Sequence, residues 1–177
     1  MIIETDRLRL RPWTDADRPG FAAICADPEV MRYLGPLQSR ANTDAAIDRA
    51  LGCEAANGFS FRAVERRDDG ALLGFCGLKP VTIDCPIKGA IEIGWRLRRD
   101  AWGQGYAFEA ARATKDHCFV FHKLPGIVSM TVAANERSWR LMERIGLSRH
   151  PQYDFDHPGL AIEDPLRPHI VYARGAG

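Results

Sequence analysis

The stretch AIEIGWRLRRDAWGQGYAFEA, residues 90–110, decides the fold because it links a strand pattern to a helix pattern through two glycines. Apolar and polar residues alternate over residues 91–98, and this period of two predicts a strand with one apolar face. Glu92 and Gly94 share the opposite, polar face of that strand. From Gln104 onward, small residues recur at spacings of three and four, which predicts a helix that packs closely on a sheet.

The loop between this strand and this helix is suited to bind a phosphate group. Gly103-x-Gly105 precedes the helix, so backbone N–H groups converge at a helix N-terminus, where the partial positive charge favours an anion. Glycine permits the torsions and the close approach that a Cβ would block. The dinucleotide pattern GxGxxG needs a small residue where Phe108 stands, and the lysine of a P-loop is absent. A plain strand-to-helix turn and a nucleotide site are the alternative interpretations.

Periodicity and turn residues predict the remaining elements. Helices are predicted near residues 15–26, from about residue 42 or 43 to 57, and at 135–145, with Gly58 and Gly146 as helix stops and Asn135 as a cap. Strands are predicted within residues 3–12, 59–67, 71–78, 126–134, 152–155 and 169–173, with a hairpin turn at residues 68–70. This order of elements predicts an α/β (α+β) fold with a mixed sheet in a single domain, residues 1–177.

Composition narrows the class of protein and the compartment. The 24 lysines and arginines nearly balance the 23 acids, so no global charge attracts nucleic acid or an anionic membrane. No apolar run approaches the ~20 residues of a membrane-spanning helix, and the N-terminus lacks the apolar segment of a signal peptide. The five cysteines lack CxxC spacing and the five histidines lack ligand spacing. We therefore expect a cytoplasmic protein with reduced thiols, without metal, and without nucleic-acid or membrane partners.

Three segments in order resemble one family of enzymes. TDRLRLRPWTDAD (residues 5–17), WGQGYAFEA (residues 102–110) and NERSWRLMERIGL (residues 135–147) resemble the GNAT superfamily of acyl-CoA-dependent N-acyltransferases, and in particular its ribosomal-protein N-terminal acetyltransferase (RimJ/RimL-like) branch. The family loop, Arg/Gln-x-x-Gly-x-Gly/Ala, is matched at Gly105 and Ala107, with Trp102 at its first place. The resemblance implies a mixed, mostly antiparallel sheet flanked by helices, whose central parallel strand pair splays apart around the pantetheine of acetyl-CoA.

The resemblance also implies which residues contact acetyl-CoA. Leu97 and its neighbours would contact the pantetheine arm, and Asn135 would contact it while also capping its helix. The pyrophosphate would lie against six consecutive residues: Trp102, Gly103, Gln104, Gly105, Tyr106 and Ala107. The implied activity is acetyl transfer to a primary amine by direct attack in a ternary complex, and the acceptor is either a protein N-terminus or a small molecule.

Acetyl transfer to an amine requires a group that accepts the amine proton and is helped by an acid for the leaving thiolate. Glu92 is the candidate base, although a solvated strand carboxylate is its alternative interpretation. The family's usual acid position holds Met142, so Ser138 is the candidate acid by resemblance, unless its hydroxyl only satisfies the helix end. We expect a structural role for Glu109 in the first helical turn. The missing tyrosine motivates the alternative function, a catalytically weak acyl-CoA-binding regulatory module.

Two further groups of polar and charged residues each have a functional and a structural interpretation. The loop YDFDHPGLAIEDPLRPH contains Tyr153, Asp156, His157 and Glu163, which either select a cationic amine or belong to an ordinary surface loop. The basic cluster of Arg96, Arg98 and Arg99 stands beside the glycine loop, as a solvated strand end or as part of a phosphate site. The sequence is compatible with a monomer or a homodimer.

Overall fold

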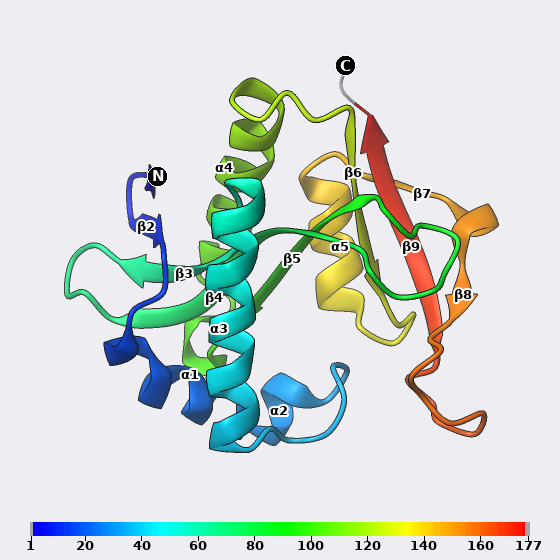
Figure 1. The fold of residues 1–177 in the computed structure, drawn as a ribbon, viewed down its shortest axis with the longest axis horizontal. Helices are drawn as coiled ribbons and strands as arrows, with labels where there is room; N and C mark the ends of the chain where they lie inside the picture. The colour runs from blue at the N-terminus through cyan, green and yellow to red at the C-terminus, as the bar shows by residue number, and fades with distance from the viewer. Residues whose placement is uncertain (1, 176–177) are drawn as a thin grey trace.

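A computed structural model describes residues 2–175 as one open sheet of nine strands with helices on both faces (Figure 1). Neighbouring strands follow the order β1-β2-β3-β4-β5-β6-β9-β7, and β8 pairs with β9. All neighbours are antiparallel except β5 and β6, which confirms the predicted mixed sheet. The strands are β1 (Ile3–Glu4), β2 (Leu8–Arg11), β3 (Phe61–Arg66), β4 (Leu72–Pro80), β5 (Ile91–Leu97), β6 (Gly126–Thr131), β7 (Ser148–Arg149), β8 (Phe155–Asp156) and β9 (Pro168–Gly175).

The parallel pair β5 and β6 splays apart, as the resemblance implies. The antiparallel β4 and β5 stay in register along all of β5, whereas β5 and β6 register only where Glu92 faces Val128. Beyond that point the two strands diverge in Figure 1. The Ser129 hydroxyl donates a 2.9 Å hydrogen bond to the Ile93 carbonyl at the start of the gap. The backbone groups of β5 beyond this point, which would pair with β6 in a regular sheet, therefore face the gap.

The helices begin and end where capping residues allow. They are η1 (Asp15–Asp17), α1 (Arg18–Cys25), α2 (Pro28–Met31), α3 (Arg40–Asn57), η2 (Arg99–Ala101), α4 (Tyr106–Val120), α5 (Glu136–Arg144) and η3 (Pro151–Tyr153). Helix α3 starts earlier than predicted because the Ser39 hydroxyl accepts from the Asn42 amide. Its end at Gly58, with φ at 76°, is as predicted. No helix within residues 2–175 is long and apolar enough to cross a membrane.

The sequence pattern does not predict helix α2 or the two-residue strand β7. Asp27-Pro28 is typical of a helix stop, but the Asp27 carboxylate accepts from the Glu29 amide and Pro28 occupies the first helical position. The same dipeptide thus ends α1 and starts α2. In the tail, residues 152 and 153 belong to η3, and only Phe155 of the predicted strand belongs to β8, because an aromatic and polar run this short has no distinctive period.

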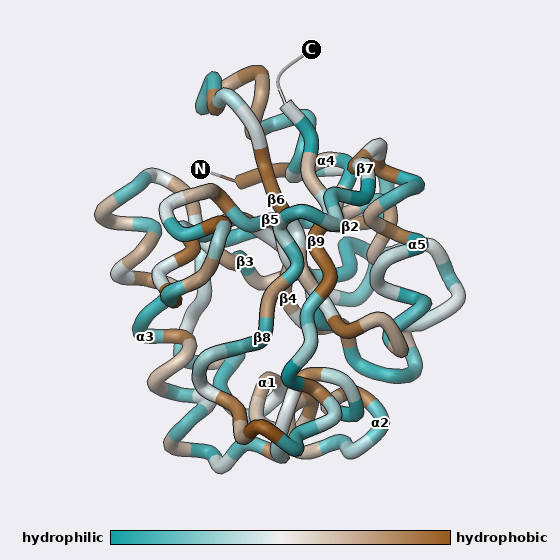
Figure 2. The backbone as a smooth tube through the Cα atoms, turned by 90° about the vertical axis from the view of Figure 1, so that its right-hand side faces the viewer, coloured by the Kyte–Doolittle hydropathy of each residue, from teal (hydrophilic) through white to brown (hydrophobic). Residues whose placement is uncertain are grey.

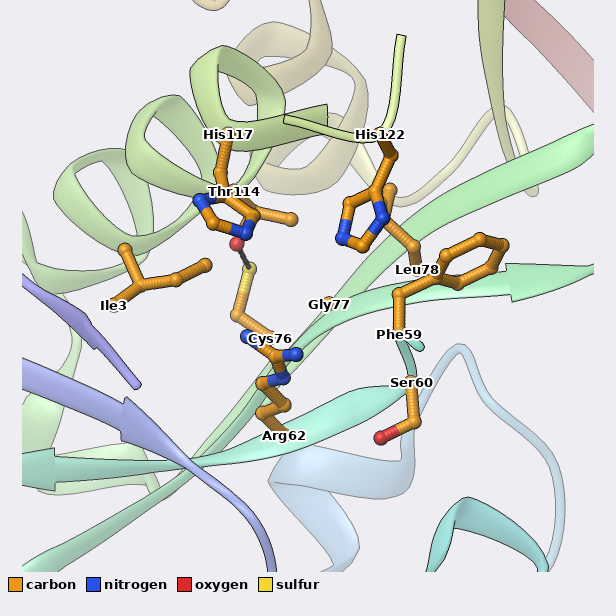
Figure 3. A pocket seen from close by; sticks show the side chains of 10 residues that line it. All are labelled: Ile3, Phe59, Ser60, Arg62, Cys76, Gly77, Leu78, Thr114, His117 and His122. Atoms are coloured by element: carbon orange, nitrogen blue, oxygen red, sulfur yellow. Dashed lines mark hydrogen bonds between the residues drawn. The ribbon is translucent and has the colours of Figure 1, made fainter. Parts of the chain in front are cut away.

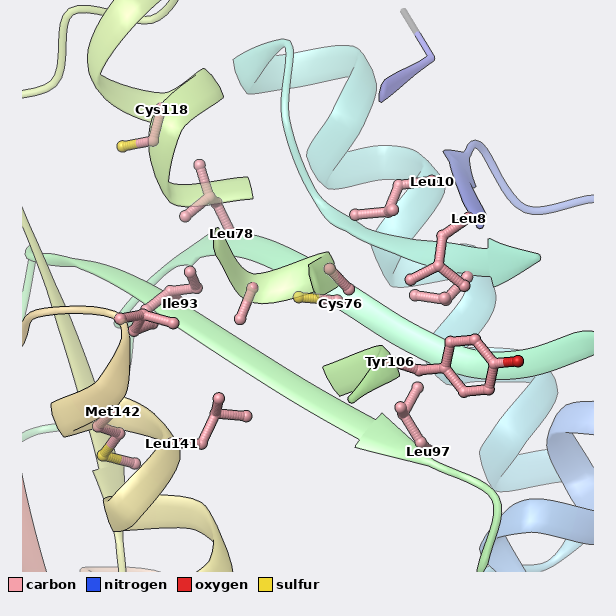
Figure 4. Close-up of a cluster of buried hydrophobic side chains, with 14 of the residues drawn as sticks. Leu8, Leu10, Cys76, Leu78, Ile93, Leu97, Tyr106, Cys118, Leu141 and Met142 are labelled. Carbon is pink, nitrogen blue, oxygen red and sulfur yellow. The ribbon is translucent and has the colours of Figure 1, made fainter. Parts of the chain in front are cut away.

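Clusters of buried apolar side chains hold the helices on both faces of the sheet, and Figure 2 shows the hydropathy of each residue along the backbone. Helices α4 and α5 cover one face through a core that includes Leu8, Ile93, Ala110 and Met142, part of which Figure 4 shows. Ala110 is fully buried, which agrees with the close packing predicted for α4. On the opposite face, α1 and α3 cover a second core, while residues 81–90 cover β6 and β9. The C-terminal end of β5 is thereby placed between the two layers of helices.

Candidate active site

A groove of about 1250 Å³ opens at the C-terminal end of β5. One wall, which we call the loop wall, consists of residues of the segment 99–108 and of helix α5. The other, the α2 wall, consists of residues 29–34 and the Arg96 side chain. The floor includes Trp95 and Leu97 of β5. The splayed strand pair and the glycine loop therefore belong to the same hollow.

The two loop glycines adopt backbone conformations that side chains disfavour. Gly103 has φ of 74° and Gly105 has φ of 83°, both in the left-handed region. Gly105 is the N-cap of α4, so the unpaired amides of the first helical turn start there. Both glycines line the groove, and apart from its two chain neighbours no residue of 2–175 lies within 4 Å of a Cβ built on Gly103. A loop of this shape is a cradle for an anion.

Hydrogen bonds fix the shape of the loop. The Trp102 indole donates to the Leu97 carbonyl at 2.9 Å, which ties the loop to the end of β5. The Gln104 side-chain amide donates to the Asp100 carbonyl at 2.6 Å, and the Arg7 guanidinium donates to the Gln104 carbonyl at 3.0 Å. Of the six predicted loop residues, Gln104 alone is absent from the groove lining. Its side chain holds the loop rather than facing a ligand.

Glu109 has the structural role that the sequence predicts, although ion pairing adds to the helix-dipole effect. Its carboxylate accepts from the Thr5 hydroxyl at 2.6 Å and from the Arg7 amide at 3.0 Å, and it pairs with the Arg7 guanidinium at 2.7 Å. Burial opposes ionisation, but these bonds hold the pKa of Glu109 below its ordinary value. The first turn of α4 is thereby fastened to the segment between β1 and β2.

The backbone of Trp95 faces the gap between β5 and β6. The Ile93 carbonyl points toward β6 and accepts from Ser129, and the Leu97 carbonyl accepts from the Trp102 indole of the glycine loop. Because backbone direction repeats every second residue, the N–H and C=O of Trp95 point into the same gap. Sequence reasoning does not single out Trp95, since a strand pattern does not reveal which of its neighbours will diverge.

Helix α5 presents one candidate to the groove and hides another. Ser138 lines the groove, and its hydroxyl makes no hydrogen bond to any residue between 2 and 175. Met142 is 1% exposed and lies in the core beneath α5 (Figure 4). The position where the family's usual tyrosine stands is therefore filled by a core side chain, whereas Ser138 is available to a ligand.

Asn135 lies at the start of α5, but its side chain does not cap the helix. The amide nitrogen donates to the Thr131 hydroxyl at 3.0 Å, and no helix amide binds the side-chain oxygen. The predicted side-chain cap is thus wrong: the backbone at ψ of 65° departs from the usual N-cap geometry and aims the side chain at Thr131 instead. Asn135 lines the groove.

Glu92 lies on the predicted polar face of β5 and is largely buried. Its side chain is 12% exposed, does not line the groove, and has Lys79 Nζ 3.2 Å from Oε2. The two charged groups attract each other, but Oε2 accepts no hydrogen bond from a residue between 2 and 175. Burial raises the pKa of Glu92, and Lys79 offsets only part of this effect. The interpretation as a fully solvated strand carboxylate does not hold.

Arginines dominate the charge of the groove. Six arginines and two glutamates line it: Arg32, Arg96, Arg99, Arg137, Arg140, Arg144, Glu29 and Glu136. On the loop wall, the Arg137 guanidinium lies over the Trp102 ring at 4.9 Å and the Arg144 guanidinium over the Phe108 ring at 4.5 Å. Stacking holds these cations beside the glycine loop without neutralising them. The groove is therefore suited to a ligand that carries several negative charges.

The basic cluster beside the loop divides into three separate environments. Arg98 forms an ion pair with Asp100 at 2.5 Å and does not line the groove. Arg99 lines the loop wall, whereas Arg96 lies on the opposite wall and donates to the Cys25 sulfur at 3.0 Å. The three residues separate because β5 ends at Leu97, so Arg96 belongs to the strand, Arg98 follows it, and Arg99 starts η2.

The polar residues of the tail loop do not gather at the groove. Tyr153 stacks on the His150 ring, and Asp156 pairs with Arg167 at 3.3 Å. His157 accepts from the Gly159 amide, and Glu163 is exposed. None of the four predicted residues lines the groove. The ordinary surface loop is the interpretation that fits the structure.

A second, smaller cavity of about 10 Å³ lies away from the groove, between α4 and the sheet (Figure 3). His117 and His122 meet there with ring centroids 5.3 Å apart, and the ring Nε2 atoms lack partners. Burial lowers the pKa of both histidines. The cation nearby is Arg62, which pairs with Glu54. Within residues 2–175 no three potential ligands form a metal-binding group.

Comparisons with known proteins agree with this architecture. Residues 7–148 match the model of the acetyltransferase (GNAT) domain. YkkB of Bacillus subtilis is 34% identical over 171 residues, which cover 96% of this chain and 93% of YkkB. The N-acetyltransferase YoaA of the same species is 30% identical over 152 residues, 84% of this chain and 83% of YoaA.

Solved structures show the same arrangement. An acetyltransferase from Agrobacterium tumefaciens superposes with a TM-score of 0.81 at 28% identity, covering 98% of this chain and 94% of that one. RimL, a ribosomal L7/L12 alpha-N-protein acetyltransferase solved with coenzyme A, superposes with a TM-score of 0.80 at 16% identity, covering 99% and 98%. The latter likeness concerns the fold. The splayed sheet and its groove define a protein of the acyltransferase class.

The particular family follows from the match over residues 7–148 and from the relatives. The chain belongs to the GNAT family of acetyltransferases.

Proposed function

We propose that the protein transfers an acetyl group from acetyl-CoA to a primary amine, by direct attack within a ternary complex in the cytoplasm. The observation that carries the proposal is the joint opening of the left-handed glycine loop and the splayed strand gap into one groove rich in arginine. An acyl-CoA needs both features, since its pyrophosphate requires amide donors and its pantetheine requires a free strand edge.

Each wall residue then has a defined task toward acetyl-CoA. Backbone amides from Gly103 to Ala107 bind the pyrophosphate, and Gln104 contributes its main chain because its side chain is occupied. Tyr106 and Ala107 start the helix whose dipole favours that charge. Trp102 holds the loop closed on Leu97, and the stacked Arg137 and Arg144 attract the phosphates. Residues Leu97 and Trp95 form the pantetheine floor, and the free side-chain oxygen of Asn135 completes it.

Glu92 accepts the proton of the attacking amine, and Ser138 protonates the departing thiolate and regains a proton from solvent. The amine nitrogen forms a bond to the acetyl carbon, the carbon–sulfur bond breaks, and the amine proton passes to Glu92. A water carries this proton, because Glu92 does not line the groove. Burial raises the pKa of Glu92, which makes its carboxylate a stronger base. The acid is of modest importance since a thiol, with a pKa of ~8.5, is a fair leaving group.

The acceptor is a protein N-terminal amine or a small-molecule amine. The first class is the one named for the RimL neighbour, and it would place this chain in the RimJ/RimL-like branch. Release of free CoA thiol from acetyl-CoA, measured over N-terminal peptides, amino acids, polyamines and aminoglycosides, tests both classes. We expect amine-dependent release and a product heavier by one acetyl group.

The acyl-CoA-binding regulatory module is the competing function, and the buried Met142 is the observation in its favour. It predicts tight binding of acetyl-CoA without thiol release for any amine in the panel. That result would contradict the proposed transferase.

A further inference from the structure

Arg96 differs from the other arginines of the groove. Five of the six are exposed, while Arg96 is half-buried and presents its guanidinium on the α2 wall. Its Nε atom is buried and has no hydrogen-bond partner among residues 2–175. Burying an unpaired cationic donor costs free energy, so a half-buried arginine in a groove is a candidate for ligand binding.

The protein does not neutralise this guanidinium. Its contacts are the Cys25 sulfur, 3.0 Å from Nη1, and the Phe75 ring, 5.5 Å away, and no carboxylate between residues 2 and 175 forms an ion pair with it. Burial raises the pKa of the Cys25 thiol, so this sulfur is uncharged at pH 7. The positive charge of Arg96 therefore remains available to an anion.

One nitrogen of the guanidinium remains for a ligand. Nη1 donates to the Cys25 sulfur and Nε is buried, so Nη2 is the nitrogen left for an anion in the groove. A charged donor of this kind binds an oxygen of a carboxylate or of a phosphate. The wall of the groove on which Arg96 lies decides between these two anions.

Arg96 lies on the α2 wall, opposite the loop wall that we propose binds acetyl-CoA, and we therefore place the acceptor beside it. Trp95 and Leu97 point into the core beneath α4, and Arg96 points the other way, toward α1 and α2. The stacked cations that suit the phosphates of acetyl-CoA lie on the loop wall instead. Glu29 is the single carboxylate among the lining residues of the α2 wall, and Arg32 adds a second cation there.

Glu92 and Arg96 share one face of β5. Four residues at about 3.3 Å each place their Cα atoms about 13 Å apart. The Phe61 ring covers the strand between them, since a Cβ on Gly94 would meet this ring at 2.9 Å. The acceptor therefore contacts Arg96 in the groove, and its amine proton reaches Glu92 through water.

We propose that the acceptor is an amine that also carries a carboxylate, as an amino acid does, and that Arg96 binds this carboxylate through its guanidinium. This inference rests on the proposed transferase and names its substrate class. It replaces the cationic acceptor that the acids of the tail loop suggest in the sequence.

Paired ligands isolate the role of the carboxylate. Glycine, β-alanine, 4-aminobutyrate and leucine are each compared with their carboxamides, which keep the amine and lose the negative charge. Calorimetry gives the dissociation constant of each compound for the protein saturated with CoA. We expect at least one acid to bind about 10- to 100-fold more tightly than its amide, as the loss of a charged hydrogen-bonded pair predicts. Equal affinity within every pair, or no binding of any acid, would overturn the inference.

Variants assign this preference to Arg96. Arg96→Met should weaken binding of the preferred acid about 10- to 100-fold and leave its amide and acetyl-CoA unchanged. Arg96→Lys should recover part of the loss, because it restores the charge without the shape of the guanidinium. Arg112→Met, an exposed arginine of α4, is the matched control and should change neither ligand. Melting temperatures confirm that each variant folds.

The outcomes separate this inference from the proposed transferase. A parallel loss of acetyl-CoA affinity in Arg96→Met would show that Arg96 binds a cofactor phosphate, and the inference would fail. Thiol release that favours neutral or cationic amines would also overturn it while the transferase stands. Binding of an acid that depends on Arg96, without thiol release for any amine, would support the carboxylate site and contradict the transferase.

Discussion

The two walls of the groove are built in different ways. The loop wall comes largely from one continuous segment, residues 99–108, whose shape follows from two left-handed glycines and from hydrogen bonds within the loop. The α2 wall combines residues 29–34 with a side chain from β5 that rests on α1. The loop wall offers backbone donors, and the α2 wall offers side chains.

This difference separates cofactor binding from acceptor choice. Backbone donors bind the same phosphate regardless of most substitutions nearby, since every residue except proline supplies an N–H. Side chains on the α2 wall can change without altering those amides. We therefore expect variants of the loop wall to change the dissociation constant and KM of acetyl-CoA. Variants of the α2 wall should instead change the dissociation constant and KM of the acceptor.

The largest effect is expected from Gly105→Val. A β-branched residue is strained at φ of 83°, and its Cβ would meet the Arg7 guanidinium at 3.3 Å. We expect the dissociation constant of acetyl-CoA, measured by calorimetry, to rise about 100-fold or more through lost charge-assisted hydrogen bonds.

Gly70→Val is the matched control for this strain. Gly70 has φ of 70° at the β3–β4 turn, and no atom of another residue would lie within 4 Å of a Cβ at this position. Both variants should lose stability, by roughly 1–2 kcal/mol for a left-handed residue. Only Gly105→Val should lose affinity, and unchanged binding there would refute the phosphate cradle.

Next in size is the effect of Glu92→Gln on turnover. Loss of a general base should lower kcat about 100- to 10,000-fold while the affinity for acetyl-CoA stays the same. Activity should recover partly as the pH rises, because more of the amine is then unprotonated. Steady-state kinetics from pH 6 to 10 measures both effects, with Glu65→Gln on β3 as the control. A variant with normal kcat at pH 7 would show that another group is the base.

The raised pKa of Glu92 also predicts how the wild-type enzyme depends on pH. Its carboxylate must be ionised to act, so the rate should fall as the pH decreases through this raised pKa. The stability effect has the opposite sign. The folded state holds this proton more tightly, so the contribution of Glu92 to the free energy of unfolding should fall as the pH rises from its unfolded pKa through its folded pKa. Chemical unfolding of wild type and Glu92→Gln at several pH values measures this difference.

A smaller loss is expected for Ser138→Ala. We expect kcat to fall about tenfold, less than for many general acids, because the thiolate leaves readily without help. The KM for acetyl-CoA should change little. Ser148→Ala, an exposed serine of β7, is the control. If Ser138→Ala retained the full kcat at every pH, its hydroxyl would have no part in proton transfer.

The smallest effect is expected for Arg137→Met on the loop wall. Removing an exposed cation should weaken acetyl-CoA binding about two- to fivefold, and the difference should shrink at high salt. Binding of the acceptor should not change. Calorimetry at two salt concentrations, with Arg112→Met as the control, measures this. An acceptor affinity that fell with Arg137→Met would break the separation of the two walls.

The loop wall could be predicted from the sequence because its geometry is local. Gly103 and Gly105 require particular torsions, and the alternation along β5 places Glu92 on its face without knowledge of the rest of the chain. The mixed sheet followed from the order of elements, although the splay of the central pair came from the family resemblance.

The α2 wall could not be predicted, because its parts meet only in the folded chain. The contact between Arg96 and Cys25 joins β5 to α1, and no spacing in the sequence signals it. The backbone role of Trp95 depends on the divergence of β6. The side-chain cap predicted for Asn135 is wrong because residue type alone does not give the torsion that aims it at Thr131.

The initial-rate pattern with acetyl-CoA and the acceptor both varied tests the central claim most directly. Direct transfer across the groove requires both substrates to be bound together. Double-reciprocal plots should therefore give intersecting lines. Parallel lines, the kinetic signature of a covalent acetyl-enzyme, would contradict direct attack in a ternary complex.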